Sequence, residues 1–227
     1  MTQLNIIVTG GFGELGTAVA KAFALQGHNV CRADFAPQPS PCNHKTLDVA
    51  GIDLSKTDDC QKLVSTVKDA FGGIDALINI AGGFSWGTLD SDDTQSWQRM
   101  YTMNLLTAVT VSKAALAEIK RSETGRIVNI GAIAALSADA GMGAYTASKA
   151  GIHRFTEALA NELLGSTVTV NAILPSTIDT QANRASMPDA DTSNWVKPDA
   201  IADVILFLTS AAARSISGAL IPISKGC

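Results

Sequence analysis

Short apolar runs alternate with amphipathic stretches along most of the chain. Leu4–Val8 is an apolar run of strand length, and Glu14–Gln26 then repeats apolar residues with helical spacing. The same alternation predicts strands at Leu4–Val8, Asn29–Ala33, Ile74–Ile80, Arg126–Ile130, Val168–Leu174 and Ala219–Ile223. It predicts helices at Glu14–Gln26, Thr57–Phe71, Asp92–Lys120, Ala144–Leu164 and Asp199–Ser210, and the third of these is long enough to contain one break.

The strands are apolar throughout, which is typical of a parallel sheet buried on both faces by helices. The sequence therefore predicts an α/β fold: a single domain over residues 1–227 with a doubly wound, Rossmann-type parallel sheet. Regular structure is not expected in Asp34–Asn43, which holds Pro37, Pro39 and Pro41. Ser176–Pro198 is predicted to be a long polar loop after a strand, where open α/β sheets bind their ligands.

The composition narrows the class of protein. Of 227 residues, 46% are hydrophobic and 17% charged, which suits a sizeable core. Seventeen Lys and Arg against twenty-one Asp and Glu give a net charge of −4, so neither nucleic acid nor an anionic membrane is an expected partner. No apolar run approaches the roughly 18 residues that cross a bilayer. The N-terminus has no signal-peptide pattern, so we expect a cytoplasmic protein.

The cysteines and histidines do not predict a metal site. The four cysteines fit neither a CxxC nor a zinc-ribbon spacing, and reduced thiols are expected in a chain without an export signal. The histidines are scattered, and we expect them on the surface or behind the site. These residues are Cys31, Cys42, Cys60 and Cys227, and His28, His44 and His153.

A glycine-rich segment, residues 9–16, joins the first predicted strand to the first predicted helix. Gly11, Gly13 and Gly16 satisfy G-x-G-x-x-G, and Gly10 precedes them. Glycines allow the backbone to turn tightly and to approach a pyrophosphate at a helix N-terminus. The alternative is a tight turn in which glycines only permit close helix–sheet packing. The position between strand and helix favours dinucleotide binding.

An acidic residue ends the second predicted strand. Asp34 lies 18 residues after Gly16, close to the spacing at which an acid bonds the adenosine ribose hydroxyls. Such a carboxylate repels a 2′-phosphate, so NAD(H) is favoured over NADP(H). Arg32 lies two residues earlier and could offset that repulsion, which keeps NADP(H) open. The alternative for Asp34 is an ordinary polar residue at a strand end.

Five motifs in register resemble the short-chain dehydrogenase/reductase family. Tyr145–Lys149 matches YxxxK, and Asn79–Gly82 is similar to NNAG with Ile80 in place of the second Asn. The others are Asn104 in the long helix, Asp53-Leu54 beside the expected adenine, and Pro175–Thr180, similar to PG-x-x-x-T. The resemblance implies hydride transfer between a nicotinamide cofactor and a small carbonyl, alcohol or quinonoid substrate.

The resemblance also implies roles for individual residues. Tyr145 and Lys149 are four apart, so they share one helix face, and an ammonium near a phenol favours the phenolate. The family pattern makes Tyr145 the general acid/base, lets Lys149 lower its pKa and bind the nicotinamide ribose, and gives Asn104 a water in a proton relay. The implied cofactor contacts are Gly10, Gly11, Phe12, Gly13, Glu14, Leu15, Gly16, Asp34, Asp53, Leu54, Asn79, Ala81, Gly82, Tyr145, Lys149, Pro175, Ile178 and Thr180. The two longest helices form a dimer interface in this family, which implies a homodimer or homotetramer.

Two positions depart from the family pattern. Glu14 stands where the commonest spacing has a glycine, and Ala132 stands where the catalytic Ser usually precedes the Tyr. The quinonoid dihydropteridine reductase branch also carries Ala there, and residues 131–136 with His153 resemble that branch. The candidate substrate contacts are Ala132, Trp86, Met142, Met187 and Trp195, for which loop packing and gap filling are the alternatives.

The alanine at position 132 bears on the substrate. For a ketone, losing one donor to the developing oxyanion can cost about 10²–10³ in rate. A quinonoid system is already electron-poor and needs less help, so the sequence leaves three hypotheses. These are a general oxidoreductase, a dihydropteridine reductase that uses NADH, and a dinucleotide-binding sensor or scaffold without turnover.

Overall fold

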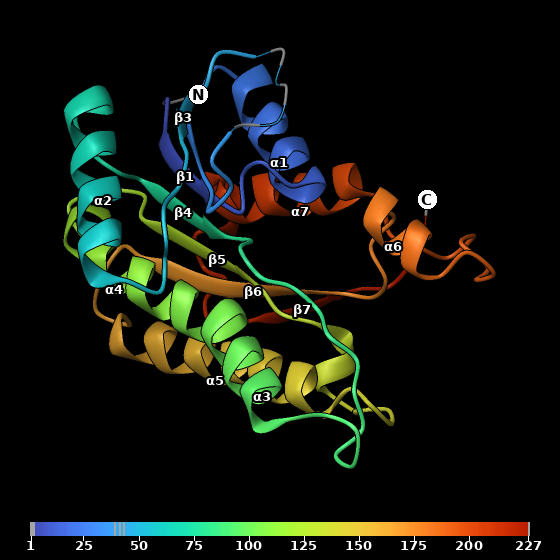
Figure 1. Ribbon diagram of the computed structural model, residues 1–227. Helices are drawn as coiled ribbons and strands as arrows, with labels where there is room; N and C mark the ends of the chain where they lie inside the picture. The colour runs from blue at the N-terminus through green and yellow to red at the C-terminus, as the bar shows by residue number, and fades with distance from the viewer. Residues whose placement is uncertain (1–2, 39, 41, 43, 227) are drawn as a thin grey trace.

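A single parallel sheet of seven strands forms the centre of the computed structural model, which describes residues 3–38, 40, 42 and 44–226 (Figure 1). The strand order is β3-β2-β1-β4-β5-β6-β7, and every neighbouring pair is parallel. The predicted doubly wound α/β fold is therefore confirmed. The strands are β1 (Asn5–Thr9), β2 (Asn29–Ala33), β3 (Leu47–Val49), β4 (Ala76–Asn79), β5 (Arg126–Ile130), β6 (Thr169–Pro175) and β7 (Leu220–Ile223).

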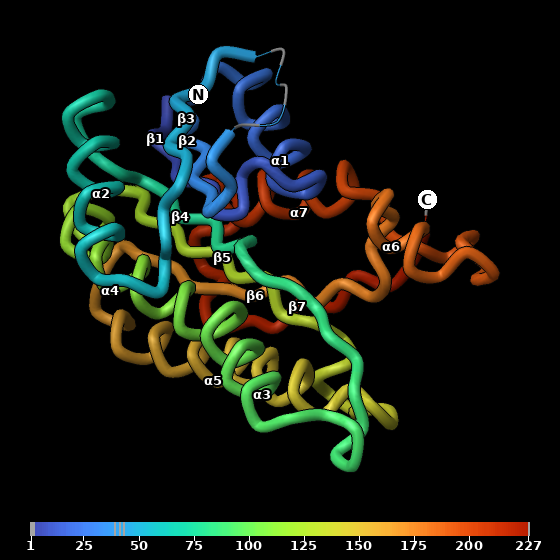
Figure 2. The backbone as a smooth tube through the Cα atoms, in the orientation of Figure 1, coloured from blue at the N-terminus to red at the C-terminus, as the bar shows by residue number. Residues whose placement is uncertain are grey.

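Helices cover both faces of the sheet, as Figures 1 and 2 show. On one face lie α1 (Glu14–Leu25) and α7 (Pro198–Thr209), which pack against each other. The other face carries α2 (Thr57–Phe71), α4 (Thr107–Ile119) and α5 (Gly143–Glu162), and α3 (Thr94–Tyr101) packs against α5. A short helix, α6 (Gln181–Ser186), lies beyond the carboxyl end of β6.

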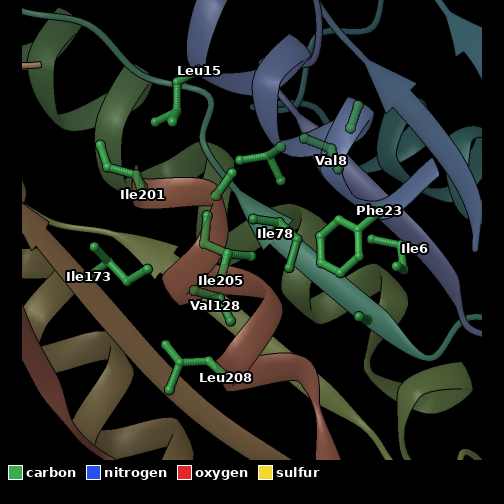
Figure 3. Packing of buried hydrophobic residues seen from close by; sticks show 14 of the residues in the cluster. Ile6, Val8, Leu15, Phe23, Ile78, Val128, Ile173, Ile201, Ile205 and Leu208 are labelled. Carbon is green, nitrogen blue, oxygen red and sulfur yellow. The ribbon is translucent and has the colours of Figure 1, made fainter. Parts of the chain in front are cut away.

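The alternation of side chains along β1 explains how one strand serves two cores. Ile6 and Val8 point into the layer under α1 and α7, whereas Ile7 points into the layer under α2 and α4. Figure 3 shows the first of these cores, in which Phe23 of α1 and Ile205 of α7 meet the strand side chains. Strands buried on both faces have no polar side to present, which is why they read as continuous apolar runs.

The order of the strands determines where a ligand can bind. The chain winds outward from β1 to β2 and β3, and then returns to place β4 on the other side of β1. The loops after β1 and β4 therefore leave the sheet in opposite directions and open a crevice at their carboxyl ends. The glycine-rich segment follows β1, and residues 80–83 follow β4, so both border this crevice.

Two elements differ from the prediction, and one expected helix break is confirmed. β3 was not expected, because a three-residue strand with a central Asp48 has no apolar run. The expected helix Asp92–Lys120 is interrupted once, by a π-helical turn at Thr102–Leu106. The expected irregular stretch Ser176–Pro198 contains α6 and a parallel bridge between Ile178 and Val196.

The remaining expectations concern thiols, metals and membranes. Cys31, Cys42 and Cys60 are free thiols, and the described residues contain no cluster of His, Cys, Asp and Glu that could hold a metal ion. Among the helices of residues 3–38, 40, 42 and 44–226, none is long and apolar enough to cross a membrane. Met1, Pro39, Pro41, Asn43 and Cys227 lie outside the described residues.

Candidate active site

A cleft of about 1060 Å³ opens at the carboxyl ends of β1, β2 and β4. Most of the predicted cofactor contacts line it: Gly10, Phe12, Gly13, Glu14, Leu15, Gly16, Asp34, Asp53, Leu54, Ala81 and Gly82. Further lining residues, which the sequence reasoning missed, are Phe35, Ala36, Ile52, Ser55, Ile80, Gln95, Gln98, Arg99, Thr102, Met103 and Thr107. Four of these flank Asp34 and Asp53, and Ile80 follows β4. The others lie on α3, on the π-turn and at the first residue of α4.

The glycines of the loop after β1 serve two different purposes. Gly10 has a left-handed φ of 61°, and a side chain on Gly16 would overlap the carbonyl oxygen of Gly10. Gly11 is equally confined, because a Cβ atom there would lie 2.6 Å from the Cβ of Arg32. Gly13 has only one atom within 4 Å of such a position and faces the cleft. Packing thus explains three glycines, whereas ligand approach is the remaining reason for Gly13.

Asp34 is fixed at the edge of the cleft by backbone donors. Its two carboxylate oxygens accept hydrogen bonds from the N–H groups of Phe12 and Ala36, each at 3.0 Å. Asp34 also lines the cleft, and its role as the ribose-binding acid stays a prediction.

Arg32 does not line the cleft, so it is not placed to bind a 2′-phosphate there, although its positive charge still acts on Asp34. Its side chain is 1% exposed and makes a double hydrogen bond to Asp48, at 2.8 and 2.6 Å. The guanidinium also lies over the ring of Phe12, 5.2 Å from its centroid. Arg32 therefore supports the glycine loop from behind.

The loop and the first helix fit the diphosphate of a dinucleotide. Helix α1 begins at Glu14, so its unpaired N–H groups and positive dipole end face the cleft beside the open Gly13. Glu14 stands where the commonest family spacing has a glycine, and its carboxylate accepts a hydrogen bond from the backbone N–H of Gln181, at 2.8 Å. This contact joins the glycine loop to α6, and it gives the negative charge a partner other than the diphosphate.

Asn104 ties the loop after β4 to helix α5. Its Oδ1 accepts the N–H of Gly83 at 2.9 Å, and its Nδ2 donates to Gly83 O and to Ser148 Oγ, both at 3.0 Å. The π-turn carries Asn104, which is 1% exposed, at the place where the helix passes this loop. Asn79 is also buried, but its amide donates to Asn129 and Ser112 and does not line the cleft.

Lys149 lies behind Gly82, which lines the cleft. Its Nζ donates to the carbonyl of Ile130 at 2.8 Å, and the residue is 6% exposed. A Cβ atom on Gly82 would lie 2.5 Å from Asn104 Oδ1 and 3.4 Å from Lys149 Nζ. Glycine is therefore required where the loop passes these two side chains, and the same Gly82 lines the cofactor cleft.

Burial determines the protonation states of Tyr145 and Lys149. It raises the pKa of Tyr145 to about 12 and lowers the pKa of Lys149 to about 8. The expected lowering of the Tyr145 pKa by the ammonium is not present in the protein alone, because removal from water dominates and Nζ is bonded to Ile130. At neutral pH the phenol is therefore protonated, which is the state that a general acid needs.

Two aromatic side chains lie on the chain segment after β4, and one of them contacts Tyr145. The rings of Phe84 and Tyr145 meet edge to face, with centroids 5.0 Å apart, although sequence reasoning had not placed Phe84 in the site. Trp86 is 63% exposed, and its indole N–H donates to the carbonyl of Ala140 at 3.2 Å. The only sequence signal for Phe84 was its place directly after Gly82-Gly83.

The other predicted substrate and nicotinamide contacts lie on separate elements. Ala132 is buried just beyond β5, and Met142 precedes α5. Met187 is partly exposed after α6, whereas Trp195 is only 8% exposed, as expected of a packed loop aromatic. Pro175 ends β6, Ile178 pairs with Val196, and the hydroxyl of Thr180 caps α6 by accepting the N–H of Asn183 at 3.2 Å.

The low pKa of Lys149 predicts a pH-dependent stability. Between about pH 8 and the ordinary lysine pKa of 10.5, the unfolded chain binds a proton that the folded protein has lost, so folding becomes more favourable as pH rises. Relative to Lys149→Met, the wild type should gain up to about 3 kcal/mol of unfolding free energy between pH 7 and pH 10. Urea unfolding at both pH values measures the difference.

Lys21→Met is the matched control, because Lys21 is an exposed residue of α1. Its difference from the wild type should not vary over this range. A pH-independent difference for Lys149→Met would show that the folded protein does not lower the pKa of Lys149.

Comparisons with known proteins agree with this geometry. A family model described as short chain dehydrogenase matches residues 4–191. Nodulation protein G of Azospirillum brasilense is 31% identical over 100% of this chain and 98% of its own. D-beta-hydroxybutyrate dehydrogenase of Cupriavidus necator is 29% identical over 94% of this chain and 93% of its own. 2-(S)-Hydroxypropyl-CoM dehydrogenase 3 of Xanthobacter autotrophicus is 28% identical over 97% of this chain and 95% of its own.

The family match covers most of the chain, including the glycine loop, Asn104, Tyr145 and Lys149. The sheet order and the cleft at its switch point agree with that match. The chain belongs to the short-chain dehydrogenase/reductase family, and it is an oxidoreductase of the kind that uses a nicotinamide dinucleotide.

Proposed function

We propose that the protein transfers hydride between NAD(H) and a small carbonyl, alcohol or quinonoid substrate, with Tyr145 as general acid and base. The observation that carries the proposal is the position of Gly82. This residue lines the cofactor cleft and also abuts both Lys149 and Asn104. A dinucleotide that follows the cleft from Asp34 past the glycine loop therefore ends beside the Tyr145 helix.

In this proposal a separate task falls to each of Tyr145, Lys149 and Asn104. Tyr145, protonated at neutral pH, gives its proton to the substrate oxygen or nitrogen during reduction. Lys149 holds the nicotinamide ribose and returns a proton to Tyr145. Asn104 fixes the loop after β4 and holds a water of the proton relay. The bound cofactor supplies the hydride. The relatives named as dehydrogenases support this reaction class, but their names give different substrates.

A second candidate is reduction of a quinonoid dihydropterin, and Ala132 favours it. The side chain at this position is a buried methyl group instead of a hydroxyl. A ketone concentrates negative charge on one oxygen as hydride arrives, whereas a quinonoid ring spreads the charge over its conjugated system. The exposed aromatic rings of Phe84, which contacts Tyr145, and of Trp86, two residues further along the chain, also suit a flat acceptor.

The two tyrosines of the chain offer a matched test. Tyr145→Phe should lower kcat for the best acceptor by at least about 10², because it removes the proton donor and leaves the ring. Tyr101→Phe should keep the wild-type rate, because Tyr101 lies on α3 and is 52% exposed. The measurement is NADH oxidation with quinonoid dihydropterin and with a panel of aldehydes and ketones.

Each outcome of this test has a meaning. A full rate in Tyr145→Phe would remove Tyr145 as the proton donor. Activity on ketones but not on the dihydropterin would reject the second candidate. Tight NADH binding without turnover on any acceptor would favour a dinucleotide sensor over the proposed reaction.

We propose NAD(H) as the cofactor because Asp34 places a carboxylate at the ribose end of the cleft. Replacing it with alanine removes this charge and frees the N–H groups of Phe12 and Ala36, which can then donate to a phosphate. Asp34→Ala should lower the ratio of kcat/KM for NADH over NADPH by at least about tenfold. Asp69→Ala, an exposed acid of α2, is the control. Equal use of both cofactors by the wild type would contradict the proposal.

We also propose that the chain forms a homodimer or homotetramer through α4 and α5, as the family resemblance implies. The large side chains of Trp97 and Tyr101 on the neighbouring α3 are 40% and 52% exposed, which adds apolar surface on this side. Light scattering in solution should give a multiple of the 23.6 kDa chain mass. A monomeric mass at micromolar concentration would contradict the proposal.

A further inference from the structure

A buried histidine lies one helical turn beyond the Tyr145–Lys149 pair. Tyr145, Lys149 and His153 follow one another at intervals of four residues, so α5 presents all three on one face. His153 is 2% exposed, and the proposed reaction gives it no part. Its surroundings at the end of β5 indicate what it does.

The imidazole accepts the first backbone N–H that the sheet leaves without a partner. The ladder between β5 and β6 continues to Gly131, whose N–H donates to Ile173 O at 2.8 Å. The next N–H, on Ala132, donates instead to His153 Nε2 at 3.4 Å. Because Nε2 accepts, the ring is neutral and carries its proton on Nδ1.

The chain makes room for this contact. A Cβ atom on Gly131 would lie 2.6 Å from His153 Nε2 and 2.8 Å from Cδ2, so a larger residue would push the ring away. Ala132 is 4% exposed, and an unpaired N–H at such a depth would be costly. The glycine and the histidine therefore form one structural unit.

The same strand end also holds Lys149. The carbonyl of Ile130 accepts from Lys149 Nζ at 2.8 Å, only two residues before the N–H that His153 takes. Consecutive turns of α5 thus hold residues 130–132 at two points. If the Ala132 contact were lost, the Ile130 carbonyl would no longer be fixed opposite the amine.

We propose that His153 is a positioning residue, which holds the Ala132 N–H so that the Ile130 carbonyl keeps Lys149 in place beside Tyr145. Burial lowers the pKa of His153, and the charges of Arg154 and Lys149 lower it further, against a smaller opposite effect of Glu157. The ring therefore stays a neutral acceptor at physiological pH. The catalytic consequence rests on the proposed function, whereas the positioning of Lys149 does not.

The first experiment measures Lys149 without substrate or cofactor. His153→Leu removes the acceptor, whereas His153→Gln keeps an oxygen near the position of Nε2. Acetylation of Lys149 by acetic anhydride, read by mass spectrometry against the exposed Lys21 in the same molecule, should be about fivefold faster in the Leu variant than in the wild type. The Gln variant should stay within about twofold of the wild type.

The second experiment is kinetic. With the best acceptor, His153→Leu should lower kcat about tenfold and change the KM for the acceptor less, whereas His153→Gln should restore most of the rate. A role in packing alone would affect both variants alike. If His153→Leu does not fold, His153→Asn replaces it, because the shorter amide cannot reach the Ala132 N–H.

The outcomes separate the two proposals. Equal acetylation of Lys149 in the wild type, Leu and Gln variants would overturn the role of His153. Faster acetylation in the Leu variant, in a protein with no turnover on any acceptor, would uphold that role and reject the proposed function. A Leu variant with faster acetylation but an unchanged kcat would overturn the link between His153 and catalysis.

Discussion

The buried amine of Lys149 is the constraint on which the arrangement of the site depends. A charged group removed from water is costly unless protein groups replace its hydration. Here a backbone carbonyl at the end of β5 accepts a hydrogen bond from the amine in place of water. Burial lowers the pKa of the amine to about 8. Everything next to the amine must therefore fit closely, which explains the glycine at position 82 and the buried Asn104 beside it.

Polar side chains around the cleft hold the protein's own backbone, so the site is organised before any ligand arrives. Asn104 holds both polar groups of Gly83, and Asp34 holds two loop N–H groups. Thr9 accepts from the first two N–H groups after β4. The loops that border the cleft are thus fixed from behind by buried residues, while their exposed backbone remains open toward the ligand.

Sequence patterns predicted the features that neighbouring residues in the chain determine. They missed the contacts between residues that are far apart in the chain. The apolar runs gave the central strands, and glycine spacing identified the cofactor loop. The ion pair of Arg32 with Asp48 was missed because Asp48 lies directly opposite it on β3, and β3 is too short and polar to be read as a strand. The bond from Gln181 to Glu14 spans 167 residues, so no local pattern could reveal it.

The alanine at position 132 bears on the kind of substrate that the site can reduce. Its methyl group cannot donate a hydrogen bond, and the backbone N–H of the same residue is already used by His153. In the proposed reaction, Tyr145 is therefore the donor that meets negative charge on the substrate. A single donor suffices when conjugation spreads that charge over a ring. When the charge stays on one carbonyl oxygen, the second donor that other members of the family provide would be missed, and this difference is the argument for the quinonoid acceptor that we propose as the second candidate.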